Sequence, residues 1–434
     1  MSSRTTYPVY ESRSGWNSLL PARTAKTNSV IENKYDFIVI GAGYTGLAAG
    51  RRLAELNGSA SILVLEASVV GEGSSARNSG FVIALPHNTN MSGHISPAEV
   101  AKKQIRVYDS GLRWLKGLVD QYHIDCGWNP QGKYHGAATA EGALSLQNTA
   151  SQYDKWGVEY QEISQAQLSE RLGTRYYRFA IQTNSNVFIQ PAALVRGLAD
   201  TLPTNVTLVE NCPVLSVEQG RERGVRTAQG LIRGDKIIVA NNGFARKLGF
   251  LKDRMFTIFT YAAITPELDP EQLALHGSEP EWGLIPANRM GTTLRKIQNN
   301  RFMVRSAYSY EKPQTEKTVL ALLEDCYRRR YPAVKSHRFE HLWGGATALT
   351  RNGATYFGEI SPNLYASVGC NGAGVLKGTC YGKLLAELMV GQKTQELADV
   401  LAMDKPNWLP PEPLRGAAVK TAIYLQKRKA GAER

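Results

Sequence analysis

Three glycines at fixed spacing are the first residues whose chemistry can be read from this sequence. Gly41, Gly43 and Gly46 form a Gly-x-Gly-x-x-Gly motif between a predicted strand, 35–40, and a predicted helix, 47–56. The first glycine allows a tight turn, the second lets backbone approach a pyrophosphate, and the third lets the helix pack closely on the strand. Free N–H groups and the helix dipole favour an anion at this helix N-terminus. The motif therefore predicts a dinucleotide-binding site.

An acidic residue stands where a dinucleotide site needs one. Glu66 follows the next predicted strand, 61–65, and lies 20 residues beyond Gly46. A carboxylate at this position accepts a hydrogen bond from a ribose hydroxyl. Because it would repel a 2′-phosphate, Glu66 favours NAD or FAD over NADP.

Two further glycine-rich segments favour FAD over NAD. Residues 71–80 offer hydroxyls, Arg77 and backbone N–H groups that can line phosphates and an isoalloxazine ring. Residues 368–375 read as a strand end, a glycine turn and a second helix start. The N-terminus of that helix can stabilise negative charge on a reduced flavin. Three such elements in this order are unexpected by chance.

Taken together, five short motifs resemble the FAD-dependent oxidoreductases of the D-amino-acid oxidase superfamily. They read GAGYTGLAAG, VLEA, GSSARNSG, VANNGF and VGCNGAGV. That superfamily includes the glycine oxidases and sarcosine oxidases, and the pattern is most similar to gamma-glutamylputrescine oxidase-like proteins. The polar arm at 1–34 and the Trp-Gly-Gly segment at 343–345 also resemble that group.

The resemblance implies a set of FAD-binding residues spread over these motifs. The set is Gly41, Gly43, Tyr44, Thr45, Gly46, Glu66, Ala67, Ser74, Ser75, Arg77, Asn78, Ser79, Gly80, Val214, Asn242, Gly243, Gly345, Gly372, Ala373, Gly374, Val375 and Leu376. Cys370 does not match the family's usual attachment position, so we expect the FAD to be bound without a covalent link.

The resemblance also implies the reaction. A hydride passes from the carbon next to an amine nitrogen to flavin N5, the imine is hydrolysed, and O2 or another acceptor reoxidises the flavin. Sarcosine oxidases have an oxygen-assisting lysine on a flavin-facing strand, and its approximate match here is Arg295 or Lys296. Their carboxylate-binding lysine matches Leu376, with Lys377 one residue later. We therefore take Arg295, Lys296 and Lys377 as the candidate catalytic residues.

Other polar and aromatic residues are weaker candidates for a substrate pocket. Arg305, Tyr261, Tyr308 and Trp282 lie on predicted strands of a second sheet, where a guanidinium suits a carboxylate and an aromatic ring can wall a pocket. His337 and His341 have the spacing of metal ligands on a helix, but their surroundings favour a strand. We predict no metal site.

The elements that would position these residues indicate an α/β protein. We expect a Rossmann-type FAD-binding domain interleaved with a substrate domain built on an antiparallel sheet. Strands are predicted at 206–209, 214–217, 236–240, 255–264, 292–305 and 364–368, and helices at 96–122, 191–201, 315–330 and 374–390, with 142–172 mostly helical. The predicted division is an arm at 1–34, an FAD-binding domain at 35–90, 186–250 and 340–400, a substrate domain at 91–185 and 251–339, and a basic tail at 401–434.

Composition limits the class of protein and its compartment. Of 434 residues, 43% are hydrophobic and 21% are charged, which suits a globular chain with a sizeable core. The apolar run at 37–50 is interrupted by glycines and is shorter than the roughly 20 residues that span a bilayer. The N-terminal residues lack the pattern of a secretory signal. Five scattered cysteines without a Cys-x-x-Cys motif favour a reducing compartment, so we expect a cytoplasmic protein.

The net charge leaves two alternative functions open. Lys and Arg number 51 against 38 Asp and Glu, so the formal charge is +13. Outside 328–330 and 420–434 the basic residues are dispersed, and we expect a solvated surface with a small-molecule amine as substrate and no nucleic-acid partner. The alternatives are a quinone-linked amine dehydrogenase at the membrane surface, with the basic tail in peripheral contact, and an RNA-modifying flavoprotein.

Overall fold

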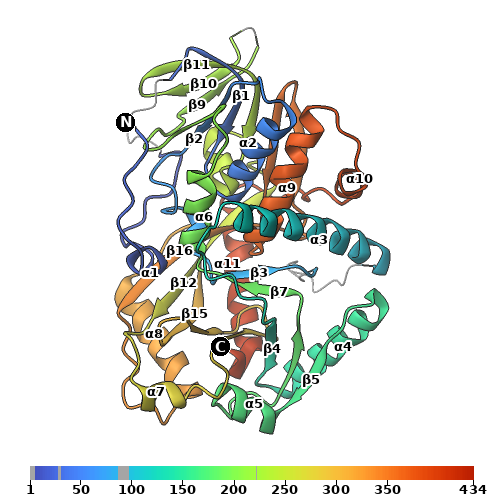
Figure 1. The fold of residues 1–434 in the computed structure, drawn as a ribbon. Helices are drawn as coiled ribbons and strands as arrows, with labels where there is room; N and C mark the ends of the chain where they lie inside the picture. The colour runs from blue at the N-terminus through green and yellow to red at the C-terminus, as the bar shows by residue number, and fades with distance from the viewer. Residues whose placement is uncertain (1–4, 28–30, 87–96, 221) are drawn as a thin grey trace.

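Two large sheets, one above the other in Figure 1, organise the chain in the computed structural model. The structure describes residues 5–27, 31–86, 97–220 and 222–434. The helices within these ranges are α1 Gly15–Ser18, α2 Tyr44–Leu56, α3 Ala98–Gln121, α4 Ala140–Trp156, α5 Gln165–Leu172, α6 Pro191–Asp200, α7 Pro270–Ala274, α8 Glu316–Arg330, α9 Gly374–Met389, α10 Gln395–Leu401 and α11 Leu414–Ala430.

The first sheet is largely parallel, as a dinucleotide-binding fold requires. Its order is β17 (Tyr356–Ser361), β18 (Leu364–Val368), β11 (Gly230–Val239), β1 (Lys34–Ile40), β2 (Ile62–Leu65) and β8 (Val206–Val209), with β10 (Gly224–Thr227) and β9 (Ser216–Glu218) branching from β11. The strands from β18 to β8 run parallel, and β17 is antiparallel to β18. All four residues of β2 are buried, which is typical of a parallel strand covered on both faces. Helices α2 and α9 lie side by side against this sheet.

The second sheet is antiparallel except at one pair of strands. Its order is β16 (His341–Thr350), β12 (Met255–Ile264), β15 (Arg301–Tyr310), β14 (Thr293–Ile297), β13 (Trp282–Pro286), β4 (Lys133–Ala137), β6 (Phe179–Thr183) and β5 (Gln161–Ser164). Only β13 and β4 are parallel among these pairs of described strands. A two-stranded sheet of β3 (Phe81–Ile83) and β7 (Asn186–Phe188) completes the fold. The expected α/β architecture with a second, antiparallel sheet is confirmed.

Two local expectations were wrong. Residues 292–305 form two strands, because Asn299 and Asn300 take positive φ values of 61° and 54° and turn the chain back as a hairpin. The predicted strand 214–217 is displaced to 216–218. The stretch 142–172 is mostly helical, as predicted, in α4 and α5, and β5 between them is a sheet-edge strand with three exposed residues.

One segment that the predicted boundaries assign to a single domain contributes strands to both sheets. Within 340–400, β16 pairs with β12 in the second sheet, whereas β17 and β18 belong to the first. The chain thus passes from one sheet to the other between β16 and β17. Our division into domains remains a prediction at this level of detail.

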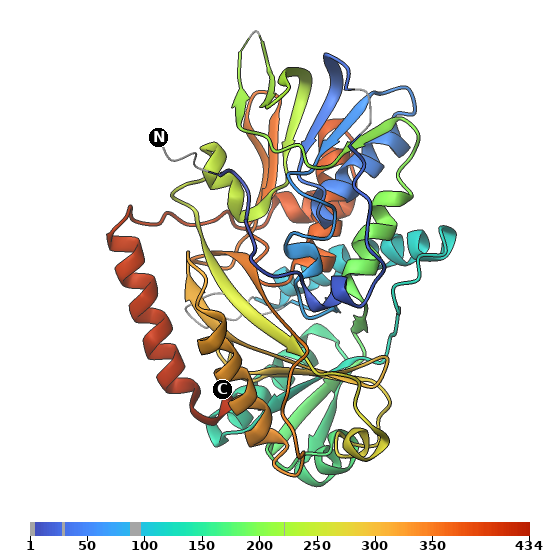
Figure 2. The same cartoon turned by 90° about the vertical axis from the view of Figure 1, so that its left-hand side faces the viewer.

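The C-terminal segment is an ordered part of the fold. Helix α11 stands along one side of the second sheet (Figure 2). Its Val419 packs with Phe256, Ile258 and Leu409 in a small apolar cluster. Beyond the helix, Glu433 is buried and its carboxylate accepts hydrogen bonds from the N–H groups of Ala138 and Thr139 at 2.9 and 3.0 Å. The basic residues of this segment therefore belong to a packed helix.

Candidate functional site

The three motif glycines have the geometry that their spacing predicts. Gly41 has φ of 101°, a left-handed conformation that favours glycine. Gly43 precedes the first turn of α2, and a Cβ there would lie 2.7 Å from Ser75 Oγ. A Cβ on Gly46 would lie 1.8 Å from the carbonyl oxygen of Gly41. Strand, turn and helix therefore approach one another at a distance that only glycines permit, and the N-terminus of α2 is left open for an anion.

Glu66 lies at the end of β2, beside the motif. Its carboxylate accepts hydrogen bonds from the N–H of Ala42 (2.8 Å) and the N–H of Ser68 (3.2 Å). Burial raises the pKa of Glu66, although these N–H donors partly oppose the effect. The carboxylate is held in a fixed position at the edge of the predicted ribose site.

Residues 71–80 form a tightly bonded loop over the start of α2. Ser75 Oγ accepts from the N–H of Tyr44 (3.3 Å), and Ser74 Oγ donates to the carbonyl of Ala346 (2.6 Å). Asn78 closes the loop by donating to the carbonyl of Ser75 (2.7 Å) and accepting from the N–H of Gly80 (2.9 Å). The loop is thereby fixed to α2 on one side and to β16 on the other.

Arg77 is fastened to backbone and does not point to the helix N-terminus. Its guanidinium donates to the carbonyls of Glu72 (2.7 Å), Gly344 (3.0 Å) and Ser12 (2.8 Å), and it lies 3.7 Å from the ring centre of Tyr10. The side chain is almost fully buried and still borders the main cavity. It holds the shape of the loop.

The two later glycine turns meet each other, although 127 residues separate them. Asn242 Oδ1 accepts from the N–H groups of Gly369 (3.0 Å) and Cys370 (3.3 Å), and its Nδ2 donates to the sulfur of Cys370 (3.3 Å). Gly369, Asn371 and Gly372 all have positive φ, so the chain turns sharply here before α9 begins at Gly374. The N-terminus of α9 thus borders the same space as the loop at 71–80.

Two cavities connect these elements. The larger has a volume of about 1260 Å³, above the roughly 300–1,000 Å³ of an ordinary ligand pocket. The smaller, of about 120 Å³, is lined by Gly41, Glu66, Ala67, Val214 and Gly243 among others. Gly43, Ser74, Ser75 and Asn242 line both. The cavities therefore meet at the N-terminus of α2, where a dinucleotide would place its pyrophosphate.

Most of the residues predicted to bind FAD line one of these cavities. The larger cavity is lined by Tyr44, Thr45, Arg77, Asn78, Ser79, Gly345, Gly372, Gly374 and Val375. Gly46, Gly80, Ala373 and Leu376 line neither. The first of these serves helix packing, and Leu376 is buried in the core beneath α9.

A buried polar atom indicates that the smaller cavity is built for a polar ligand. Asn241 lines it, and its Oδ1 is buried with no hydrogen-bond partner among the described residues. Buried acceptors without a partner are uncommon. A ligand that carries a donor, such as the amino group or a ribose hydroxyl of an adenine nucleotide, would satisfy it, so the residues present fit the predicted cofactor.

Two of the three candidate catalytic residues lie away from the cavities. Arg295 is buried against Glu281 and donates to the carbonyls of Ser79, Gly80 and Ile189 at 2.8 to 3.1 Å. Lys296, its neighbour on β14, points to the opposite face and donates to the carbonyl of Gly277 (2.9 Å). Neither lines the cavity. The geometry gives both residues a structural role.

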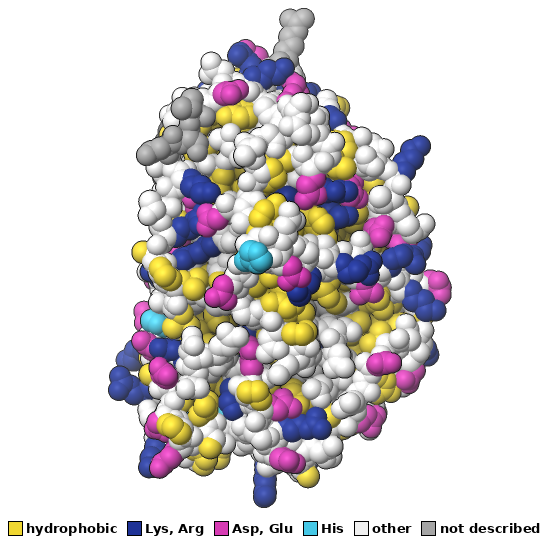
Figure 3. Space-filling model, viewed as in Figure 1, with side chains coloured by type: hydrophobic (Ala, Val, Ile, Leu, Met, Phe, Trp, Pro, Cys, Tyr) yellow, Lys and Arg dark blue, Asp and Glu magenta, His cyan; other side chains and the backbone are white. Residues whose placement is uncertain are grey.

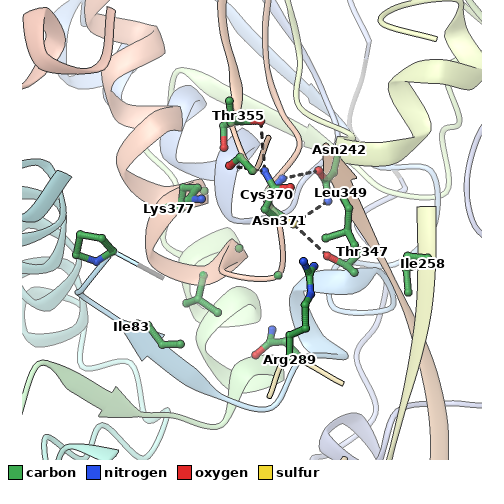
Figure 4. Close-up of a pocket in the computed structure, with 18 of the residues that line it drawn as sticks. Ile83, Asn242, Ile258, Arg289, Thr347, Leu349, Thr355, Cys370, Asn371 and Lys377 are labelled. Carbon is green, nitrogen blue, oxygen red and sulfur yellow. Dashed lines mark hydrogen bonds between the residues drawn. The ribbon is translucent and has the colours of Figure 1, made fainter. Parts of the chain in front are cut away.

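Lys377 and an arginine that the sequence did not single out face the larger cavity. Arg289, in the turn between β13 and β14, and Lys377, on the first turn of α9, reach into it from two sides (Figure 4). Burial lowers the pKa of each side chain. Six Lys and Arg side chains line this cavity against two carboxylates among the described residues. The cavity is therefore positively charged.

The weaker candidates also fall into two groups, those that line the larger cavity and those that do not. Arg305, Tyr261 and Tyr308 line the cavity, and Arg305 donates to the hydroxyl of Tyr308 (2.7 Å). Trp282 is buried in the second core. Within the described ranges no group of three or more His, Cys, Asp or Glu could hold a metal ion, and none of the described helices is both long and apolar enough to cross a membrane.

Comparison with known proteins gives concordant results. A family profile described as FAD dependent oxidoreductase (DAO) matches residues 36–388. A probable oxidoreductase OrdL of Rhizobium meliloti is 24% identical over 395 residues, which cover 89% of this chain and 90% of that protein. The gamma-glutamylputrescine oxidoreductase of Escherichia coli is 26% identical over 364 residues, covering 82% and 84%. The crystal structure of glycine oxidase from Geobacillus kaustophilus superposes with a TM-score of 0.72 at 18% identity, covering 84% of this chain and 96% of that one.

Proposed function

The chain belongs to the DAO family of FAD-dependent oxidoreductases, and on that premise we propose that it oxidises an amine or amino acid at the carbon next to the nitrogen. The observation that carries the proposal is the continuous space from the N-terminus of α2 to Lys377 and Arg289. One end has the shape expected for a dinucleotide. The other end, the part of the larger cavity that Lys377 and Arg289 line, is positively charged and is called the chamber below. The similarity to gamma-glutamylputrescine oxidoreductase and to glycine oxidase supports an amine donor.

The residues that would hold FAD follow from the two cavities. Glu66 and Val214 would bind the adenosine, and the N-terminus of α2 with Ser74 and Ser75 would bind the pyrophosphate. The turn at 369–374 would border the flavin. When bound, FAD supplies the two-electron acceptor for the amine. No cysteine other than Cys370 lines the cavities among the described residues, and we expect the flavin to be bound non-covalently and released by denaturation.

The charge of the chamber has two consequences for a substrate. The guanidinium of Arg289 and the ammonium of Lys377 can bind a carboxylate or another anionic group. The same positive charges, together with burial, lower the pKa of a bound amine. An amine must be neutral to give up a hydride readily, so these side chains favour the reactive form. A substrate with one amine and one anionic group fits both requirements.

The test is anaerobic reduction of the FAD-loaded protein. A panel of amino acids and matched amines without a carboxylate is mixed with the enzyme, and loss of the oxidised-flavin absorbance is recorded. We expect at least one amino acid to reduce the flavin, and the Arg289→Met variant to need a concentration raised by about tenfold or more. Arg178→Met, which removes an exposed arginine, should be unaffected. Failure of every amine to reduce a fully loaded protein would contradict the proposal.

A second candidate differs in the electron acceptor. The outer face of α11 exposes Leu414, Tyr424 and Leu425 at 65%, 59% and 51%. Lys420 and Arg428 are exposed on the same helix, which has no acidic residue. Basic and apolar side chains on one helix face suit an anionic membrane surface, where a quinone would replace O2. Peroxide yield against quinone reduction, with and without anionic vesicles, distinguishes the two candidates. Interspersed acidic and basic side chains on the face in Figure 3 do not favour the RNA alternative.

A further inference from the structure

The N-terminal arm, residues 5–20, lies against the two connected cavities, called the cofactor slot below, although it is outside the family profile. The profile begins at residue 36, and none of the motifs that predicted the FAD site includes the arm. In Figure 2 the arm runs down one side of the molecule, from beside the first sheet to α1 near the second. Its contacts fall at three positions along the slot.

The lower end of the arm is anchored by Trp16 in α1. Trp16 is 2% exposed and packs edge-on against Trp343, with ring centres 6.4 Å apart. Its indole N–H donates to the carbonyl of Asn78 (2.7 Å), and its own carbonyl accepts from Gln190 Nε2 (2.7 Å). The anchor therefore holds the loop at 71–80 and the second sheet at once.

The middle of the arm is pinned at Tyr10. Its ring lies under the guanidinium of Arg77 at 3.7 Å, a distance that suits a cation–π contact. Its hydroxyl accepts from the N–H of Ala346 (3.2 Å) and lies 3.5 Å from Ser74 Oγ. Ser74 and Ala346 line both cavities, so Tyr10 contacts, from behind the lining, two residues at the point where the cavities join.

The upper end of the arm forms a wall of the smaller cavity. Thr6, Tyr7 and Pro8 line it together with Glu66 and Asn241. Thr6 Oγ1 donates to the carbonyl of Val214 (2.7 Å), and this bond holds the arm across the cavity. Val9, by contrast, is 70% exposed.

From these contacts we propose that Thr6, Tyr7 and Pro8 complete the nucleotide site of FAD, and that the arm must lift before FAD can leave. FAD can contact the arm only when the arm is closed. Bound FAD therefore favours the closed arm to the same degree that closure of the arm favours FAD binding. The arm acts as a strap with a fixed anchor at Trp16 and a movable end at Thr6. This inference rests on FAD binding and not on the nature of the amine.

The experiment measures release of FAD. Holoprotein is mixed with an excess of a second apoprotein that binds FAD tightly and traps what is released, and the rate constant of FAD release is followed by the change in flavin fluorescence. Removal of residues 1–9, and separately the double substitution Tyr7→Ala with Pro8→Ala, should each raise the rate constant by about tenfold or more. Val9→Ala is the matched control and should release FAD at the rate of the unmodified protein. Thermal unfolding of the FAD-free forms checks that the fold is intact.

A second measurement tests the reciprocal effect. Hydrogen exchange at the backbone N–H groups of residues 6, 7, 9 and 10 reports how often the movable end of the arm leaves the surface. FAD should slow this exchange severalfold in the full chain. Equal release rates in the folded double variant and the unmodified protein, or exchange at these residues that FAD does not change, would overturn the proposal. Because neither measurement uses an amine, both remain informative if no amine reduces the flavin.

Discussion

Arg295 of β14 and Glu281, the residue before β13, form a buried ion pair, with Nη2 and Oε1 2.6 Å apart and both side chains less than a tenth exposed. The same guanidinium donates to the carbonyls of Gly80 and Ile189 at 3.0 and 2.8 Å. It therefore ties the second sheet to the loop that follows the cofactor motif. A residue that the family pattern suggested as catalytic is, in this chain, part of the connection between the two sheets.

Breaking this pair should destabilise the protein strongly. Glu281→Ala leaves the Arg295 charge buried without its partner, and we expect a loss of about 3–5 kcal/mol in the free energy of unfolding. Denaturant titration measures the change. The control is Glu218→Ala, which removes a surface carboxylate that pairs with Arg226 at 3.3 Å. It should lower the free energy of unfolding by less than about 1 kcal/mol. Similar losses in both variants would show that the buried pair has no special role.

The central strands of the first sheet were predictable because their apolar sequence pattern matches their burial in the structure. The strand predicted at 35–40 is β1, and the strand at 364–368 is β18 with the same bounds. Both are apolar runs closed by glycine. The edge strand β5 could not be found this way, since only Ile163 of its four residues is buried. Its pairing with β6 comes from tertiary contact rather than from its own composition.

Replacing Gly46 should disrupt the nucleotide site. In Gly46→Ala the new Cβ would lie 1.8 Å from the carbonyl oxygen of Gly41, so α2 must move away from β1. We expect a loss of at least about 3 kcal/mol in stability and FAD affinity too weak to survive purification. Gly58→Ala meets nothing within 4 Å and should leave both unchanged. Retention of FAD at full occupancy in the Gly46→Ala protein would contradict the assignment of this turn.

Glu66 should have opposite effects on the FAD-free and FAD-loaded protein. Because burial raises its pKa above the unfolded value, Glu66 contributes stability that is fully present below the unfolded pKa and is lost as pH rises through the folded pKa. At neutral pH its charge is thus unfavourable without FAD. Glu66→Gln should keep or raise the unfolding temperature of the FAD-free protein at pH 7, and this gain should vanish in acid.

The same substitution should weaken FAD binding, since the proposed ribose hydroxyl would lose a charged acceptor. We expect the Kd for FAD to rise by about tenfold, measured by quenching of flavin fluorescence. Ser68→Ala changes a neighbour that contacts Glu66 only through its backbone N–H and is a suitable control. An unchanged Kd in Glu66→Gln would place the ribose elsewhere.

The substrate end of the site shows what the sequence could not reveal. Arg295 and Lys296 are adjacent on β14, so their side chains point to opposite faces, and only the folded sheet shows that neither side chain lines the cavity. Arg289 lies in a turn without any periodic pattern, and its place opposite α9 depends on how the two sheets pack. Motif spacing located the residues around the expected pyrophosphate, because they are local to one strand and one helix. Long-range packing decided the rest.

Titration of Lys377 should make the KM for an amino acid depend on pH in a way that the KM for the matched amine does not. Burial lowers its pKa below that of an ordinary lysine, so as pH rises Lys377 loses its charge earlier, and a substrate carboxylate then loses one partner. The KM for an amino acid should therefore rise at alkaline pH, whereas the KM for the matched amine without a carboxylate should not share this rise. The substrate amine titrates in both compounds, so their ratio isolates the carboxylate. Lys377→Arg keeps a charge throughout this range and should remove the alkaline rise in the ratio; a rise that persists in that variant would assign the effect to another group.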